Sequence, residues 1–218
     1  METLELAALL ASRLCHDLVG PIGAVHNGLE ILADETDADM RRRAIELMDQ
    51  SATEAARRLQ FYRLAFGAAR RDGAGHGLDE ARDAAQGLFA AGKIALDWPV
   101  ANLGPEPTGD RMVVKLLLNM ILVGAEALAR GGTLSVNLSS EGADVRLLVA
   151  ATGPGANLTE ETRVLLAGTG DSATVNARSI QPYFTARLAE DLKTAIKSTS
   201  PEVGRIDIEA LVASSGRP

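Results

Sequence analysis

Apolar and small residues recur every three or four positions through the first 66 residues, which is the spacing of amphipathic helices. The first run comprises Ala11, Leu14, Leu18, Ile22, Val25, Leu29 and Leu32, and the second comprises Met40, Ala44, Leu47, Ser51, Ala55, Leu59, Tyr62 and Phe66. The pattern breaks between Asp34 and Asp39, where Thr36 or Asp37 can cap the next helix. Two helices of about 30 residues, each about 45 Å long, are therefore predicted.

A single pair of such helices leaves half of each apolar stripe in contact with water. Two hairpins that associate as a four-helix bundle cover both stripes. The sequence therefore predicts a homodimer built by residues 1–68.

From residue 78 onward the pattern alternates between helix and strand. Helices are expected at 78–92, 110–130, 159–166 and 176–197, the last one bent or begun by Pro182, and strands at 93–99, 133–139, 144–151 and 205–212. A glycine-rich, charged stretch before residue 78 is typical of a connection. We therefore expect an α+β protein with a helical hairpin at 1–68, a linker at 69–77 and an α/β sandwich at 78–218, in which helices cover one face of a mixed sheet.

Charge and composition narrow the possible partners. The 22 basic and 29 acidic residues give a net charge of −7, which argues against nucleic acid as the main partner. No uninterrupted apolar run approaches the roughly 18 residues of a membrane span, and the N-terminus opens with acid rather than with Lys or Arg. The single cysteine, Cys15, excludes an internal disulfide and a Cys-rich metal site. A soluble cytoplasmic protein with no membrane contact is expected.

His16 lies on the side of the first helix that is opposite its apolar stripe, about 160° from the stripe's centre. Its neighbours on that side are Ser12, Gly20, Gly23 and Asn27. Each glycine in a helix costs about 1 kcal/mol relative to alanine, and Pro21 removes a backbone hydrogen bond and predicts a kink. Small residues beside an exposed imidazole leave room for the backbone of another protein.

Asp17 follows the histidine directly and can accept a hydrogen bond from its Nδ1–H. Such a bond fixes the tautomer in which Nε2 is free and nucleophilic. The alternative is an ordinary surface histidine, which is how we interpret His26 and His76. A metal site is not expected, because no second histidine or carboxylate has ligand spacing on the face of His16. Cys15 is interpreted as a small packing residue.

The run Ser-Arg-Leu-Cys-His-Asp-Leu-Val-Gly-Pro at 12–21 resembles the H-box of two-component histidine kinases. Over residues 2–212 the chain resembles the ChpT-type histidine phosphotransferases, and the segment 118–128 supports this likeness. The resemblance implies a dimerising helical hairpin followed by a domain shaped like the ATP-binding domain of a kinase. It also implies that His16 is the phosphoacceptor, that Asp17 sets its tautomer and that Pro21 is the helix kink.

Departures from the kinase pattern argue against ATP binding. Val123 or Gly124 stands where kinases carry the asparagine that holds Mg²⁺, and neither can bind a hard cation. Ala151 replaces the aspartate of the Asp-x-Gly-x-Gly box, and Pro154 lies between its glycines. The later Gly-Thr-Gly segment at 168–170 is short. We therefore expect a kinase-like domain that binds no nucleotide.

Gly20 stands near the position where kinases that also act as phosphatases carry a water-orienting Asn, Thr or Gln. A phosphoryl group on His16 is therefore expected to be passed on rather than hydrolysed.

The resemblance implies a relay in which His16 carries a phosphoryl group between receiver-domain aspartates of a hybrid histidine kinase and of response regulators. The receiver supplies Mg²⁺, so no cofactor or metal of the chain's own is expected. The residues expected to contact the receiver are Ser12, Arg13, Val19, Gly20, Gly23 and Asn27. Two alternatives remain open, an ATP-dependent histidine kinase and a non-catalytic dimeric adaptor for receiver domains.

Overall fold

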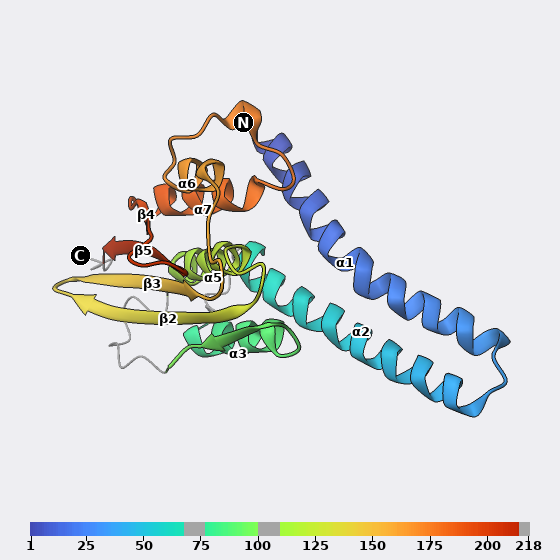
Figure 1. Cartoon of the computed structure of the whole chain (residues 1–218). Coiled ribbons are helices and arrows are strands. Elements are labelled where there is room, and N and C mark those ends of the chain that lie inside the picture. Colours follow the sequence, from blue (N-terminus) through green and yellow to red (C-terminus); the bar gives the residue numbers. More distant parts are fainter. Residues whose placement is uncertain (68–76, 100–109, 214–218) are drawn as a thin grey trace.

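The computed structural model describes residues 1–67, 77–99 and 110–213. A long helical hairpin projects from a body in which helices cover a β-sheet (Figure 1). The predicted α+β class, with an N-terminal hairpin followed by an α/β sandwich, is confirmed. The linker predicted at 69–77 falls almost wholly outside the described residues, and so does His76.

The hairpin consists of α1 (Thr3–Asp34) and α2 (Ala38–Phe66), as the periodicity predicts. Asp37 is the N-cap of α2, and its carboxylate accepts hydrogen bonds from the backbone N–H groups of Asp39 and Met40. This cap satisfies two of the N–H groups that a helix start leaves without partners.

The two helices meet through small residues. Pro21 and Gly28 are the buried residues of α1, and Ala44 and Ser51 are among those of α2. A Cβ atom on Gly28 would lie 2.3 Å from Cγ of Met48, so the absence of a side chain is what permits this approach. Because small residues make the contact, several large apolar side chains of the hairpin remain exposed.

The sheet has five strands in the order β1-β2-β3-β5-β4. They are β1 (Ile94–Asp97), β2 (Gly132–Glu141), β3 (Asp144–Thr152), β4 (Ile196–Thr199) and β5 (Arg205–Ala213). β1 runs parallel to β2 and the other neighbours are antiparallel, so the sheet is mixed, as predicted. Gly142, with φ +65°, forms the tight turn that joins β2 to β3.

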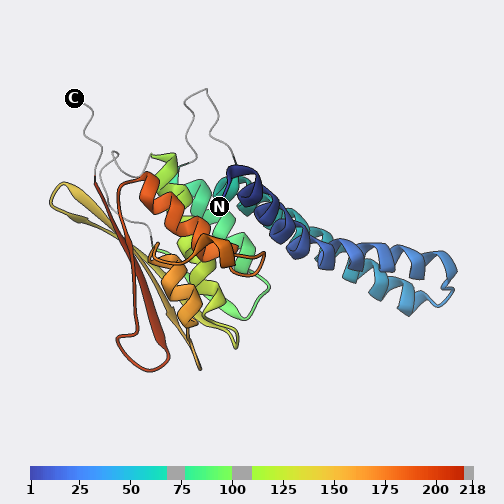
Figure 2. The same ribbon diagram turned by 90° about the horizontal axis from the view of Figure 1, so that it is seen from above.

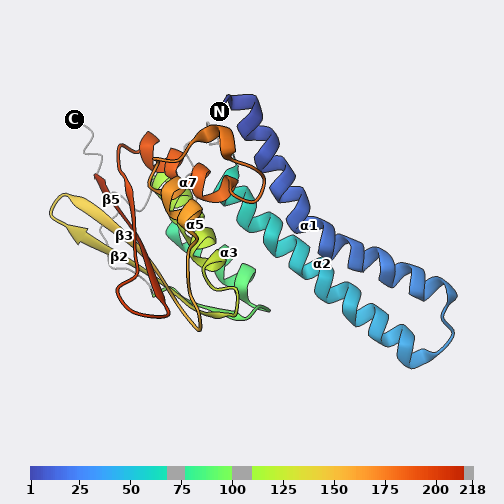
Figure 3. The same cartoon turned by 45° about the horizontal axis from the view of Figure 1, so that its top comes forward.

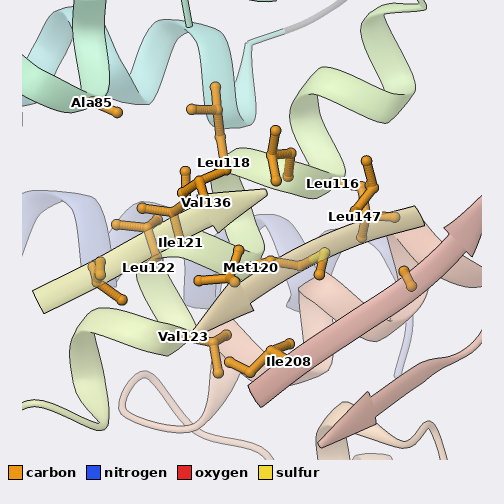
Figure 4. Packing of buried hydrophobic residues seen from close by; sticks show 14 of the residues in the cluster. Ala85, Leu116, Leu118, Met120, Ile121, Leu122, Val123, Val136, Leu147 and Ile208 are labelled. Atoms are coloured by element: carbon orange, nitrogen blue, oxygen red, sulfur yellow. The ribbon is translucent and has the colours of Figure 1, made fainter. Parts of the chain in front are cut away.

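Helices cover one face of this sheet (Figure 2). They are α3 (Leu78–Phe89), α5 (Arg111–Glu126), α6 (Glu160–Leu166) and α7 (Ile180–Asp191), with a short 3₁₀ turn, η1 (Ser172–Thr174). α5 is the central helix, and eleven of its residues are buried. Its side chains Leu118 and Ile121 lie near Val136 of the sheet in the core shown in Figure 4.

The prediction of a helix at 176–197 is wrong at both ends. α7 begins at Ile180, and Pro182 lies in its first turn, where a missing N–H costs no helical hydrogen bond. The helix ends at Asp191, and Lys193 takes φ 55°. The chain then forms β4, which pairs with β5 at the edge of the sheet. A four-residue strand whose partner lies farther along the chain gives only a weak local signal.

The base of the hairpin is built into the body. Phe61, Leu64 and Ala65 of α2 belong to the same buried core as α5 and the sheet. Near the start of α1, Leu6, Leu9 and Leu10 pack on Leu165, Val175 and Ile180. The other end of the hairpin projects away from the body (Figure 3).

By length and composition alone, α1 also qualifies as a helix that can cross a membrane. In the structure it pairs with α2, and it carries Arg13, His16 and Asp17 among its apolar residues.

Candidate functional site

His16 lies on α1 where the hairpin leaves the body, and its side chain is 89% exposed. It points into solvent, as helical periodicity predicts. A Cβ atom added at Gly20 or Gly23 would meet nothing within 4 Å. No distant part of the chain therefore packs against these two positions, and they leave an open surface beside the imidazole.

The other residues expected to contact a receiver are placed unequally. Ser12 and Val19 are exposed within about one turn of His16 on α1, and Asn27 is exposed about three turns farther along the helix. Arg13 differs from the expectation, because its side chain is only 17% exposed and its Nη2 donates to Oε1 of Glu126 at 2.6 Å. Arg13 therefore belongs to a contact within the chain, and we remove it from the docking surface.

Asp17 is the centre of a polar cluster behind His16. Its Oδ1 lies 3.5 Å from Nδ1 of His16, at the long end of hydrogen-bonding distances. Its Oδ2 accepts a hydrogen bond of 2.7 Å from the hydroxyl of Tyr62 on α2. Nε of Arg13 lies 4.0 Å from the same Oδ2. The carboxylate is therefore held on one side and faces the imidazole on the other.

Pro21 explains a second contact of Asp17. A proline inside a helix has no N–H for the carbonyl four residues before it, and that carbonyl belongs to Asp17. Nη1 of Arg58 on α2 donates to this oxygen. Arg58 is itself held by Glu54, whose Oε1 lies 2.5 Å from Nη2. Pro21 thus leaves the carbonyl oxygen of Asp17 free to accept a hydrogen bond from Arg58, which holds the backbone beside His16 against α2.

Burial and charge shift two ionisable groups of this cluster. Burial and the neighbouring Asp17 raise the pKa of Tyr62, so its hydroxyl keeps its proton and acts as a donor. Burial also raises the pKa of Glu126, while Arg13 opposes that shift. Glu126 stands at the end of α5, so this ion pair joins the central helix of the body to the helix that carries His16.

Sequence reasoning missed Tyr62, Arg58 and Glu126 as residues of this site. Their contacts with α1 join residues between 41 and 113 positions apart, which no local pattern reveals. One signal was present, since Pro21 implies that the carbonyl of Asp17 needs another donor.

The kinase-like positions of the body are packed rather than open. Val123 is fully buried, and a Cβ atom on Gly124 would approach Leu134 to 2.9 Å. Asn119 is buried as well, and its amide donates to the carbonyl of Ala65 at the end of α2. Asn119 thus links the hairpin to the body. Within the described part of the chain, no group of three or more His, Cys, Asp or Glu residues could hold a metal ion.

The segment after β3 is also closely packed. Ala151 is buried, and the N–H of Gly153 donates to the carbonyl of Gly204 at 2.9 Å. A Cβ atom on Gly153 would lie 2.5 Å from the carbonyl oxygen of Gly131. The glycine at 153 is therefore explained by a tight contact between two turns.

An outward imidazole, a carboxylate at its Nδ1 and an open helical surface can accept a group on Nε2 and give it to a second protein. These features, on a helical hairpin beside an α/β body, define a phosphotransfer protein. The family model for the histidine phosphotransferase C-terminal domain matches residues 78–203. The chain is 37% identical over 205 residues to protein phosphotransferase ChpT of Brucella abortus (strain 2308), covering 93% of this chain and 95% of that protein.

A solved structure of a bacterial phosphotransferase superposes with a TM-score of 0.82 at 36% identity, covering 96% of this chain and 97% of that one. The catalytic domain of histidine kinase ThkA is 17% identical, with a TM-score of 0.47 over 64% of this chain and 94% of that one. The chain belongs to the ChpT-type histidine phosphotransferases. The predicted family and the predicted phosphotransferase activity are confirmed.

Proposed function

We propose that His16 accepts a phosphoryl group from a phospho-aspartate of one receiver domain and passes it to an aspartate of another. The observation that carries this proposal is the exposed imidazole of His16 beside Gly20 and Gly23, which leave open space, with Asp17 at its Nδ1. A group transfer between two proteins needs an accessible nucleophile more than it needs an enclosed pocket.

The transfer balances without a separate base. The lone pair of Nε2 attacks phosphorus, the bond from phosphorus to the aspartate oxygen breaks, and the donor keeps a free carboxylate. The proton on Nδ1 stays there, facing Asp17. The second receiver's aspartate then attacks the phosphorus, the N–P bond breaks, and Nε2 regains its lone pair.

Mg²⁺ and the positive charge around the phosphoryl group are supplied by the receiver, so this chain contributes no metal and no cofactor of its own. The partners are receiver domains of a hybrid histidine kinase and of response regulators. They dock on the face formed by Ser12, Val19, Gly20, Gly23 and Asn27. Each of these residues is small or short, which lets a receiver bring its aspartate close to Nε2.

The hairpin also forms a homodimer through a four-helix bundle. Ile22 and Leu29 of α1, and Ile45 and Leu59 of α2, are each more than half exposed. Several large apolar side chains exposed on one hairpin are typical of a subunit interface. Cys15 is exposed too, seven residues before Ile22 on the same stripe.

The exposed apolar residues of the two helices share one side of the hairpin. Ile22 and Leu29 come directly after Pro21 and Gly28, the buried residues of α1, and Ile45 comes directly after Ala44, a buried residue of α2. Each step along a helix turns the side chain by about 100°. Because the two helices are antiparallel, the residue that follows a contact residue points to the same side of the hairpin in both helices. His16 lies about 120° from Ile22 around α1, so a dimer through this side leaves the imidazole accessible.

We infer that the protein is soluble and cytoplasmic, and that it transfers the phosphoryl group without binding ATP. The net charge of −7 fits neither nucleic acid nor an anionic membrane surface. Packing of Val123 and Gly124 against the sheet leaves no ligand where a kinase holds Mg²⁺. Tight binding of Mg-ATP in a calorimeter would favour the kinase alternative instead.

The proposal is tested by incubating the intact protein with a panel of ³²P-labelled phosphorylated receivers. We expect at least one receiver to transfer its label, and the labelled product to be lost in acid and to survive base, as phosphohistidine does. Failure of every receiver to transfer label would contradict the proposal and favour a non-catalytic adaptor.

A further inference from the structure

We propose that Tyr62 is a positioning residue for phosphotransfer, whose hydroxyl holds the carboxylate of Asp17 so that its other oxygen faces Nδ1 of His16. This inference rests on the proposed role of His16, and it assigns to α2 a part in preparing the nucleophile on α1. Tyr62 does not touch the reacting atoms and acts through Asp17.

The two oxygens of Asp17 have separate partners. Oδ2 accepts the hydroxyl of Tyr62 at 2.7 Å, whereas Oδ1 lies 3.5 Å from Nδ1 of His16. A carboxylate without a second partner can rotate and hydrate freely. A donor fixed at Oδ2 restricts that rotation and keeps Oδ1 toward the imidazole.

The ring of Tyr62 is itself immobilised. It packs edge-on against Phe61 and Phe66 of the same helix, with ring centroids 6.2 and 5.7 Å away. Phe66 in turn lies 5.6 Å from the ring of Phe184 on α7. Three of the chain's few aromatic residues cluster in the sequence at 61, 62 and 66, and the structure joins them to the body of the protein. This row of rings gives the hydroxyl a fixed place.

The backbone of Asp17 is held from the same helix. Arg58, one turn before Tyr62 on α2, donates to the carbonyl of Asp17 that Pro21 leaves free. Side chain and backbone of one residue are thus each bound by α2. Packing of α1 against α2 alone would not require either hydrogen bond to Asp17, because elsewhere in the hairpin the two helices meet through small side chains.

The chemical consequence concerns the tautomer of His16. A neutral imidazole carries its proton on either Nδ1 or Nε2, and only the first form leaves Nε2 as a nucleophile. A carboxylate oxygen held at Nδ1 favours that form. Burial and the adjacent carboxylate raise the pKa of Tyr62, so its hydroxyl remains a donor throughout the pH range in which imidazoles titrate.

Tyr62→Phe tests this role because it removes one oxygen and keeps the ring packing. The matched control is Tyr183→Phe, which makes the same change at the other tyrosine of the chain, on α7, where it packs on the cluster of Leu165, Val175 and Ile180. We expect single-turnover transfer from a phosphorylated receiver to slow about tenfold in Tyr62→Phe, and to stay at the wild-type rate in Tyr183→Phe. Equal rates in Tyr62→Phe and wild type would overturn the proposal.

A spectroscopic readout separates positioning from a general loss of structure. The tautomer of His16 is read from its side-chain ¹⁵N shifts at pH about 8, where imidazoles are neutral. We expect the Nδ1–H form to be more populated in wild type than in Tyr62→Phe or in Asp17→Asn. Asp17→Asn tests the premise of this role, that the carboxylate of Asp17 sets the tautomer of His16, and so keeps the proposal falsifiable should Tyr62→Phe not fold. Unchanged tautomer populations in either folded variant would contradict the proposal.

The double variant shows whether Tyr62 acts through Asp17. In the Asp17→Asn background, Tyr62→Phe should slow transfer no further. An equal slowing in both backgrounds would overturn the positioning role. The NMR measurement uses no receiver, so it decides the role of Tyr62 even if no receiver phosphorylates His16.

Discussion

Arg13 of α1, three residues before His16, forms an ion pair with Glu126 of α5, in which Nη2 and Oε1 lie 2.6 Å apart. The pair ties the hairpin to the central helix of the body at the level of the candidate site. A rearrangement of α5 relative to α1 would therefore reach His16 through Arg13 and Asp17, whose charged groups approach to 4.0 Å.

The ion pair predicts a specific pH dependence of stability. Burial raises the pKa of Glu126 above its ordinary value of 4.5, so just above that value the native state binds more protons than the unfolded state. The free energy of unfolding of wild type relative to Glu126→Gln should therefore fall as the pH rises through and beyond 4.5. Because Arg13 opposes the shift, Arg13→Ala should make this fall steeper. Urea unfolding at several pH values measures both effects, and a relative stability that rises with pH would contradict the argument.

The glycines beside His16 predict a conflict between stability and transfer. Gly23→Ala fills open space in a helix and should stabilise the protein by up to about 1 kcal/mol. Gly20→Ala should stabilise it less, because a Cβ atom on the residue before Pro21 meets the proline ring in the helical conformation. Both should slow transfer from a receiver, because the added methyl groups occupy the docking surface. Gly28→Ala is the control within the same helix, since its Cβ would strike Met48 and should cost about 1–2 kcal/mol. Unfolding and transfer assays that show unimpaired transfer in the first two variants would argue against docking at this surface.

The two exposed sides of α1 predict separable effects of the same substitution. Ile22→Glu places a charge in the apolar stripe and should convert the proposed dimer to a monomer, as measured by light scattering. Asn27→Glu places it on the side of α1 that carries His16, about 140° from Ile22 around the helix, at an exposed position, and should slow transfer without changing the oligomeric state. A dimer that survives Ile22→Glu would show that this stripe is not the interface.

Asn119 predicts a large stability loss from a single buried amide. Asn119→Ala removes two donors and leaves the carbonyl of Ala65 and the amide of Gln181 without this partner. The expected loss is about 2–4 kcal/mol. Asn137→Ala, at an exposed position of β2, should change stability by less than about 0.5 kcal/mol. Comparable losses in the two variants, measured by urea unfolding, would refute the assigned role of Asn119.

Helical periodicity predicted much of the hairpin. It placed both long helices, a cap at Thr36 or Asp37, of which the structure has Asp37, and the outward direction of His16, because each depends on residues close together in the sequence. Helical periodicity gave a wrong prediction for Arg13, whose position on the first helix indicated a side chain exposed on the docking surface. Its side chain is long enough to reach Glu126 in another part of the fold.

The parts that sequence reasoning missed depend on contacts between distant segments. Tyr62 looked like one more position of an apolar stripe, yet its hydroxyl finds Asp17 across the hairpin. The strand β4 was read as the end of a helix, because Thr194 to Lys197 carry no strong strand pattern before β5 supplies a partner. Spacing along the chain sets which side chains share a face, and only tertiary packing sets what they touch.

Transfer of labelled phosphate to two histidine variants tests the central claim most directly. The intact protein is incubated with a ³²P-phosphorylated receiver that labels wild type, and His16→Ala is compared with His26→Ala, which changes a second exposed histidine of α1. We expect no label on His16→Ala, whose oligomeric state should match that of wild type, and normal label on His26→Ala. Label on His16→Ala, or its loss from His26→Ala alone, would contradict the account.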